Sequence, residues 1–300
     1  YRGYKIVSMP PPSSGGIALV EMLNILENYH FSPDEWGSSK YIHEVVETMK
    51  YVYADRTKFL GDSDFFPVPL KGLISKKYAK TIFDKIKNYA VPASDISSGD
   101  PHKFQEGHNT THYSIYDNDG NAVSTTTTIN SGYGSKIVVS GAGFLLNNEM
   151  DDFSSKPGTP NQYGLLGSKA NSIAPQKRML SSMTPTIVLK NDHPYLIIGS
   201  PGGSTIITTV LQVILNCIDF NMNIQEAIDM PRFHNQWYPD EIKYEKYAFP
   251  LDVKINLQKM GYKLKLVNHL GLAEGILIDY NNHLIYGASD PRGPGLAEGD

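Results

Sequence analysis

The sequence has a single cysteine, Cys217, among its 300 residues. One cysteine excludes a disulfide within the chain, and it excludes zinc or iron–sulfur clusters built from cysteines of this chain. No apolar run approaches about 18 residues, so we expect no membrane span. Lysine and arginine form no cluster and the formal net charge is −4, which argues against nucleic acid or an anionic membrane as the main partner.

Several catalytic motifs are absent as well. The serine-hydrolase patterns G-x-S-x-G and S-x-x-K do not occur, and the glycine turn at Ser200 to Ser204 lacks the lysine of a phosphate-binding loop. The segment His43 to Glu47 has a glutamate where the metalloprotease helix has its second histidine, and the nine histidines show no other ligand spacing. We therefore expect no catalytic metal and no cofactor.

The sequence that is present is typical of a globular protein. Hydrophobic residues make up 40% and charged residues 19%, and a chain of this length is long enough for about two domains or one large one. The chain begins Tyr1-Arg2-Gly3, which is neither a start methionine nor a signal peptide, so we expect a processed or truncated product.

Apolar spacing predicts helices and strands in mixed order without repeats, which favours helices layered on a sheet. One predicted helix follows the turn at Pro10 to Gly16, and three others cover Tyr41 to Asp55, Ala79 to Tyr89 and Ile206 to Ile218. A further predicted helix is capped by Asn223 with Glu226 and ends before Pro231. Predicted strands are Tyr4 to Met9, Thr186 to Lys190, Tyr195 to Gly199, and several between Tyr262 and Tyr286. Between them, Val91 to His108 is expected to be a linker or exposed loop.

A β-hairpin is predicted where this linker ends. Thr110 to Tyr116 alternates in polarity, Asp117 to Asn121 has turn composition, and Ala122 to Ile129 is again rich in strand formers. With a three-residue loop closed by Gly120, Thr110 pairs with Thr128, whereas a two-residue loop would shift the register by one.

Thr110 is a candidate nucleophile because it opens a strand directly after a flexible segment. Cleavage between Asn109 and Thr110 would free the amine of Thr110, which could accept the proton of its own hydroxyl. Threonine-rich strands usually occur simply because threonine favours strands, so spacing alone favours that interpretation over a nucleophile.

Three further clusters suit an acyl-transfer site for an amino acid. The amides of Gly202 and Gly203 open a helix and could stabilise an oxyanion, although the same turn could be only a tight connection. The carboxylates of Asn147 to Phe153 could bind an ammonium group, and the hydroxyls of Ser181 to Thr184 could bind a carboxylate. Alone, the acidic cluster is better explained as a solvated turn and the hydroxyl cluster as a polar strand entry, but together they predict a recognition site for an amino acid.

The blocks together, in this order, closely resemble the γ-glutamyltranspeptidases. The matching segments are Thr110 to Ser114, Leu145 to Phe153, Leu180 to Thr186 and Gly199 to Ser204, with Pro11 to Gly16 and Tyr53 to Arg56 ahead of them. The resemblance covers nearly the whole chain.

This resemblance implies an α+β fold, the four-layer αββα sandwich of the N-terminal-nucleophile hydrolases, made as a zymogen that cleaves itself. Residues 1–109 would be the C-terminal part of the large subunit and 110–300 the whole small catalytic subunit, the two associating as a heterodimer. Family precursors begin further upstream, so the resemblance places the signal peptide and the arginine that clamps the substrate α-carboxylate outside this chain. None of the five arginines here stands in a motif that matches the family's clamping arginine. A periplasmic or secreted location is also implied.

The family pattern assigns roles residue by residue. Thr110 would be the nucleophile with Thr128 near its amine, and Gly202 and Gly203 would form the oxyanion hole. The remaining residues would bind substrate: Asn130, Glu149 and Asp152 at the α-amino group, Ser181 and Ser182 at the α-carboxylate, and Tyr163 as a lid. Many relatives have glutamine where Glu149 stands here.

The implied reaction is γ-glutamyl transfer from glutathione or other γ-glutamyl compounds to water, amino acids or dipeptides through a γ-glutamyl ester of Thr110. Two other readings remain open. One is a related acylase or a poly-γ-glutamate depolymerase of the same fold, although Asp152 and Tyr163 favour a substrate with a free α-amine. The other is an inactive precursor or a binding module.

Overall fold

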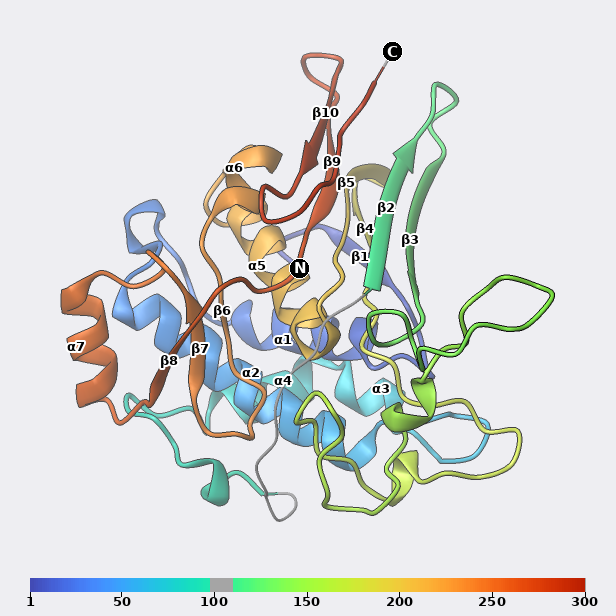
Figure 1. Cartoon of the computed structure of the whole chain (residues 1–300). Helices are drawn as coiled ribbons and strands as arrows, with labels where there is room; N and C mark the ends of the chain where they lie inside the picture. Colours follow the sequence, from blue (N-terminus) through green and yellow to red (C-terminus); the bar gives the residue numbers. More distant parts are fainter. Residues whose placement is uncertain (98–109, 300) are drawn as a thin grey trace.

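The computed structural model describes residues 1–97 and 110–299 and is centred on a five-stranded antiparallel sheet (Figure 1). Its order is β1 (Lys5–Ser8), β4 (Thr186–Lys190), β5 (His193–Gly199), β9 (Glu274–Asp279) and β10 (Leu284–Ser289). The central strand β5 is buried at four successive residues, Leu196 to Gly199. Because successive side chains point to opposite faces, both faces of the sheet must be covered.

Helices cover one face. They are α1 (Gly15–Leu26), α2 (Ser39–Phe59), α5 (Ile206–Ile218) and α6 (Ile224–Asp229), with the shorter α3 (Leu70–Leu73) and α4 (Lys76–Phe83) packed beside α1. The predicted bounds of α5 are confirmed, and α6 begins with the predicted capping box, in which Asn223 and Glu226 each accept a hydrogen bond from the other's amide. The prediction of a helix from Ala79 to Tyr89 was wrong in its bounds, since Ser75 caps α4 by accepting from the Tyr78 amide and the helix ends at Phe83.

The hairpin of β2 (Thr110–Tyr116) and β3 (Ala122–Thr128) lies on the other face, against β9 and β5. Its register is the predicted one, with Thr110 opposite Thr128 and Gly120 at φ +85° in the turn. Ser124 fastens it to the sheet: its hydroxyl donates to the carbonyl of Ile198 and accepts from the amide of Thr186. The described residues thus build a helical layer, a central sheet and two strands of a second sheet layer.

A smaller sheet and one helix complete the far side of the helical layer. The elements are β6 (Phe233–His234), β7 (Ile242–Glu245), β8 (Leu264–Val267) and α7 (Leu251–Lys259), with β7 and β8 parallel. The strands predicted in the tail are confirmed as β8, β9 and β10, whereas α7, β6 and β7 were not predicted. Buried ion pairs, Arg232 with Asp290 and Arg292 with Glu245, both 2.7 Å, join this region to the end of the chain.

The linker predicted over Val91 to His108 is wrong for its first part. Val91, Ala93 and Ile96 are buried, and the carbonyl of Ala93 accepts a hydrogen bond of 2.9 Å from the indole of Trp237. Residues 98–108 and Asn109 lie outside the described residues.

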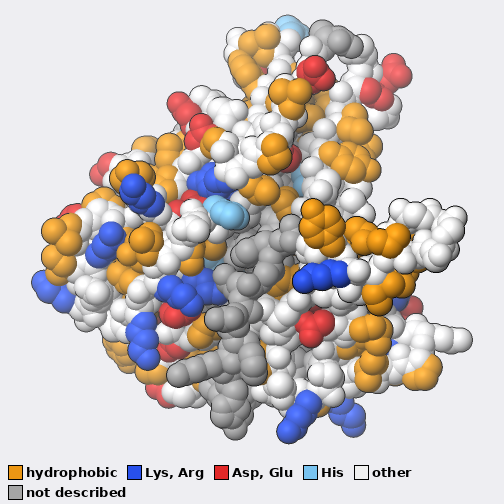
Figure 2. Space-filling model, viewed as in Figure 1, with side chains coloured by type: hydrophobic (Ala, Val, Ile, Leu, Met, Phe, Trp, Pro, Cys, Tyr) orange, Lys and Arg blue, Asp and Glu red, His pale blue; other side chains and the backbone are white. Residues whose placement is uncertain are grey.

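The connection from β3 to β4, residues 129–185, contains only short 3₁₀ turns and isolated bridges. Its first part carries exposed apolar side chains, visible to the right in Figure 2: Tyr133, Ile137, Val138, Phe144 and Leu146. Its middle part lies beneath the hairpin in Figure 1, and the 3₁₀ turn Lys169–Asn171 contacts α2.

Candidate active site

Thr110 and Thr128 lie opposite one another where the hairpin meets the helical layer. Their hydroxyl oxygens are 3.1 Å apart, and the Thr128 hydroxyl also accepts a hydrogen bond of 2.9 Å from the amide of Asn130. The register places both side chains on the inner face of the hairpin, whose next inward residue, His112, is buried. The Thr110 hydroxyl therefore stands at a fixed position with an oxygen partner already in contact.

Asn130 and Tyr163 continue the site along the chain. Asn130 is buried with φ +74°, and the hydroxyl of Tyr163 donates to its main-chain oxygen at 2.9 Å and also contacts its Oδ1. Tyr163 is itself buried, and its carbonyl accepts from the side chain of Gln236. The predicted lid residue is thus packed over the pocket.

The glycine turn lies directly under the Tyr163 ring. Gly203, at φ +57°, opens a 3₁₀ turn (Gly203–Thr205) that runs straight into α5, and the described residues place no acceptor on its amide. A Cβ at this position would lie 2.5 Å from the Tyr163 ring, so both the backbone angle and the contact require glycine. An amide at the start of a helix is a suitable donor for a developing negative charge.

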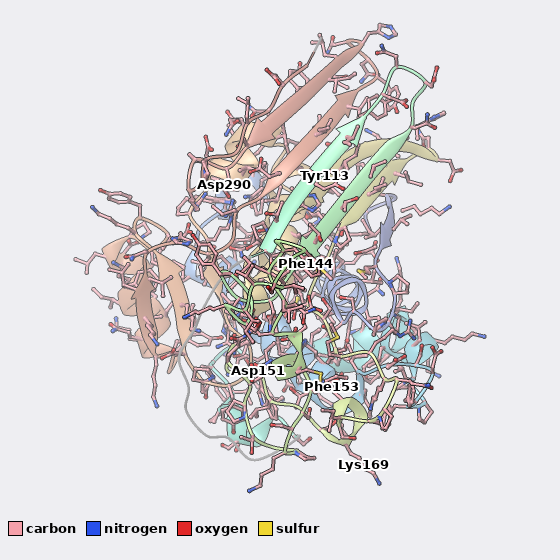
Figure 3. The ribbon with its side chains drawn as sticks, turned by 45° about the vertical axis from the view of Figure 1, so that its right-hand side comes forward. Tyr113, Phe144, Asp151, Phe153, Lys169 and Asp290 are labelled. Carbon is pink, nitrogen blue, oxygen red and sulfur yellow. The ribbon has the colours of Figure 1, made fainter. Side chains whose placement is uncertain are left out.

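Asp152 provides the acidic side of the pocket. It is the last residue of the 3₁₀ turn Glu149–Asp152. Its sequence neighbours Asp151 and Phe153 are labelled in Figure 3, where they lie below the start of the hairpin. Burial raises the pKa of Asp152 to about 7, with the charge of Arg56 opposing that shift. No hydrogen bond from another described residue reaches its carboxylate, which leaves the group available to a bound cation.

Ser181 and Ser182 also line the pocket. The Ser181 hydroxyl accepts from the amide of Met183 at 3.0 Å, and the Ser182 hydroxyl accepts from the guanidinium of Arg56 at the same distance. Both hydroxyl oxygens are therefore occupied as acceptors and can donate their protons elsewhere.

A single pocket collects most of the predicted residues. It is lined by Arg56, Thr110, Thr128, Asn130, Asp152, Tyr163, Leu165, Ser181, Ser182, Met183, Gly203 and Ile206. Glu149 and Gly202 do not line it: Glu149 lies at the other end of the 3₁₀ turn, where burial raises its pKa, and Gly202 precedes Gly203 at φ +141°. Asn109 lies outside the described residues.

Sequence reasoning missed Arg56 together with the apolar lining residues Leu165, Met183 and Ile206. Arg56 carried a usable signal. It stands three residues after Tyr53 on the buried face of α2, where a charged side chain is rare without a partner or a function.

Among residues 1–97 and 110–299, no group of three or more histidine, cysteine, aspartate or glutamate side chains could hold a metal ion. In the same part of the chain, no helix combines the length and apolar character that crossing a membrane requires.

The sequence model of the γ-glutamyltranspeptidase family matches residues 1–299. The chain belongs to this family. The glutathione hydrolase proenzyme of Escherichia coli is 51% identical over 293 residues, which are 97% of this chain and 50% of that protein.

Solved structures agree on the family and the fold. A mutant of the Helicobacter pylori γ-glutamyltranspeptidase has 59% identity and a TM-score of 0.60 over 61% of this chain and 100% of that one. The cephalosporin acylase of Bacillus halodurans has 28% identity and a TM-score of 0.82 over 100% of this chain and 52% of that one. The predicted α+β N-terminal-nucleophile hydrolase fold is thereby confirmed. The chain spans about half the length of the curated relatives it matches.

Proposed function

We propose that this γ-glutamyltranspeptidase family member transfers the γ-glutamyl group of glutathione and related compounds to water, amino acids or dipeptides. The observation that carries the proposal is the pocket, in which a threonine hydroxyl stands among an oxyanion donor, a free carboxylate and two serine donors. This arrangement suits an acyl group that carries both an ammonium and a carboxylate.

The chemistry begins at Thr110. Its hydroxyl attacks the γ-carbonyl and its α-amine, once freed by cleavage after Asn109, takes the proton and passes it to the leaving amine. The amide of Gly203, with that of Gly202, stabilises the oxyanion of the tetrahedral intermediate. Water or an amino acid then attacks the resulting γ-glutamyl ester and releases Thr110.

The substrate is held at both ends of its amino-acid moiety. Asp152, with Asn130 and Glu149, binds the α-ammonium, and Ser181 and Ser182 donate hydrogen bonds to the α-carboxylate. Tyr163 closes the pocket above Gly203 and excludes water.

Two subunits are part of this proposal. Residues 110–300 are 191 of the 300 residues, a share close to the 61% of this chain that covers the whole matched Helicobacter pylori chain. Strand β1 from residues 1–109 pairs with β4 from residues 110–300, so after cleavage the two pieces would stay joined by one sheet and one core.

Replacing Thr110 by alanine tests the proposal. We expect the protein expressed from its whole reading frame to yield a fragment beginning Thr110-Thr111-His112 and to release p-nitroaniline from γ-glutamyl-p-nitroanilide. Thr110→Ala should remain uncut and lose at least about 10³-fold of the activity, because nucleophile and base are one residue.

Thr127→Ala is the matched control, since Thr127 is the exposed neighbour of Thr128 on the other face of β3. It should be cut and active. An uncut wild type without activity would favour a binding module, and an uncut but active Thr110→Ala would refute the assignment.

An acylase remains the second candidate because of the similarity to cephalosporin acylase. A glutaryl group has no α-amine, so it would leave the Asp152 carboxylate unpaired in the pocket. We therefore expect γ-glutamyl-p-nitroanilide to be preferred over glutaryl-p-nitroanilide, and the reverse preference would support the acylase.

A further inference from the structure

Arg56 differs from the other four arginines of the chain. Arg2, Arg178, Arg232 and Arg292 each form an ion pair with a carboxylate at 2.6 to 3.1 Å. Arg56 is only 4% exposed, yet no carboxylate of the described residues lies within ion-pair distance of its guanidinium. A buried charge that contacts only hydroxyls is costly, which suggests that it serves an anion that comes from outside the chain.

The hydrogen bonds of Arg56 lead to one short segment of the pocket wall. Its Nη2 donates to the Ser182 hydroxyl at 3.0 Å, and its Nε donates to the Ser14 hydroxyl at 2.9 Å. Ser14 in turn donates to the carbonyl of Ser181 at 2.6 Å. Arg56 therefore holds Ser181 through its backbone and Ser182 through its side chain.

The direction of these bonds sets the polarity of the pocket. A guanidinium can only donate, so the Ser182 oxygen is an acceptor toward Arg56 and its proton must point elsewhere. The Ser181 oxygen is likewise an acceptor, toward the Met183 amide. No described residue accepts from either hydroxyl, so both protons are available to an anion in the pocket.

We propose that Arg56 is a positioning residue that makes Ser181 and Ser182 a paired donor for the α-carboxylate of the γ-glutamyl substrate. This inference rests on the proposed function. It gives the pocket a positive group within this chain in addition to the carboxylate of Asp152, and so a preference for substrates that carry both charges.

A pair of substrates tests the role of Arg56. γ-Glutamyl-p-nitroanilide has the α-carboxylate, and 4-aminobutyryl-p-nitroanilide has the same amine and scissile amide without it. In the intact protein, we expect Arg56→Gln to raise KM for the glutamyl substrate at least about 10-fold with a smaller change in kcat, because a charge-assisted contact is lost. KM for the aminobutyryl substrate should stay within about 2-fold of the wild type.

Two further variants distinguish positioning of the serine hydroxyls from a general contribution to the stability of the fold. Arg56→Lys keeps the positive charge but lacks the planar set of guanidinium donors, so it should retain part of the preference for the glutamyl substrate that Arg56→Gln loses. In a Ser182→Ala background, Arg56→Gln should raise KM by clearly less than in the wild type, since the two residues act in series. Arg2→Gln is the control, because Arg2 pairs with Asp219 at the far end of α5, about 20 Å along that helix from Gly203.

The outcomes are distinguishable. An equal loss on both substrates, or no loss on either, would overturn the role of Arg56 while leaving the proposed function intact. A wild type that does not cleave the glutamyl substrate would remove the proposed function and this inference with it. Should Arg56→Gln not fold, Arg56→Lys decides, and an unchanged preference between the two substrates would refute the inference.

Discussion

The two halves of the pocket are held in place in different ways. Thr110, Thr128 and Gly203 belong to the hairpin and to the strand–turn–helix unit of β5 and α5, where backbone pairing fixes their positions. Asp152 and Tyr163 belong to the irregular connection of residues 129–185, which has no strand or long helix and is held by backbone turns and side-chain hydrogen bonds. The atoms that we propose to react are thus placed by regular structure, and the groups that we propose to bind substrate are placed by loops that rest on it.

Side-chain hydrogen bonds supplement the backbone turns of that connection. Asn148 accepts from the amide of Ser131, Asn161 from those of Tyr163 and Leu165, and Asn171 from that of Leu180. Each such bond contributes about 1 kcal/mol. We therefore expect substitutions in the two halves to differ in kind: in the regular half they should lower kcat, and in the loop half they should raise KM.

Gly203→Ala should have the largest effect of the three changes that test this difference. A methyl group would meet the Tyr163 ring at 2.5 Å and would move the amide away from the oxyanion. We expect kcat to fall about 10²-fold or more, the size of effect seen when one oxyanion donor is lost. Steady-state kinetics on γ-glutamyl-p-nitroanilide measure it.

The matched control is Gly37→Ala. Gly37 also has a positive φ, +70°, but no atom lies within 4 Å of the position that a Cβ would occupy there, so the backbone strain is similar without the contact. It should lose about 1 kcal/mol of stability and keep its activity. If both variants lose activity equally, backbone strain alone explains the result and the oxyanion role falls.

The difference between the halves also decides what could be predicted from the sequence. The hairpin register followed from strand alternation and one glycine, and α5 from an unbroken apolar helix, because these signals are local. In contrast, β6 and β7 carry buried polar residues such as His234 and Lys243, and α7 buries only Val253 and Leu257. Their partners are distant in sequence, so no local pattern marked them.

For the loop half of the site, the residues alone suggested only that the carboxylates of residues 147–153 could bind an ammonium group, and the individual roles came from the family resemblance. The sequence around Asp152 has the composition of a solvated turn, and nothing local indicates that Tyr163 reaches Asn130. Arg56 was missed for a related reason: its partners Ser14 and Ser182 are 42 and 126 residues away. Such contacts exist only once the fold has brought the segments together.

The pH dependence of binding is the second prediction, since it tests the loop-borne carboxylate directly. Burial raises the pKa of Asp152 to about 7, so below that pH the group is protonated and cannot pair with an ammonium. We expect kcat/KM for γ-glutamyl-p-nitroanilide to fall about tenfold per unit as pH drops below 7 and to level off above it.

Glutaryl-p-nitroanilide provides the control because it has no amine. If titration of the Thr110 amine caused the fall in kcat/KM below pH 7, the fall would appear with both substrates. If titration of Asp152 causes it, the fall should appear with the glutamyl substrate alone. Asp152→Asn should abolish this fall in kcat/KM. The variant should also melt no lower than the wild type at pH 8, because burial disfavours the ionised carboxylate in the folded state. If the fall persists in Asp152→Asn, another group causes it.

Tyr163→Phe should have the smallest effect and is the sharpest test of the loop half. It removes the hydroxyl that donates to Asn130 but keeps the ring against Gly203, so the oxyanion donor should stay in place. We expect KM to rise about 3- to 10-fold, which corresponds to one lost hydrogen bond, with kcat within about 2-fold. Tyr133→Phe, at a 74% exposed tyrosine of the same connection, should change neither constant. A fall in kcat without a change in KM would mean that Tyr163 acts on the reacting atoms. The rule that loop residues affect KM and regular elements affect kcat would then be wrong for Tyr163, whose ring contacts Gly203.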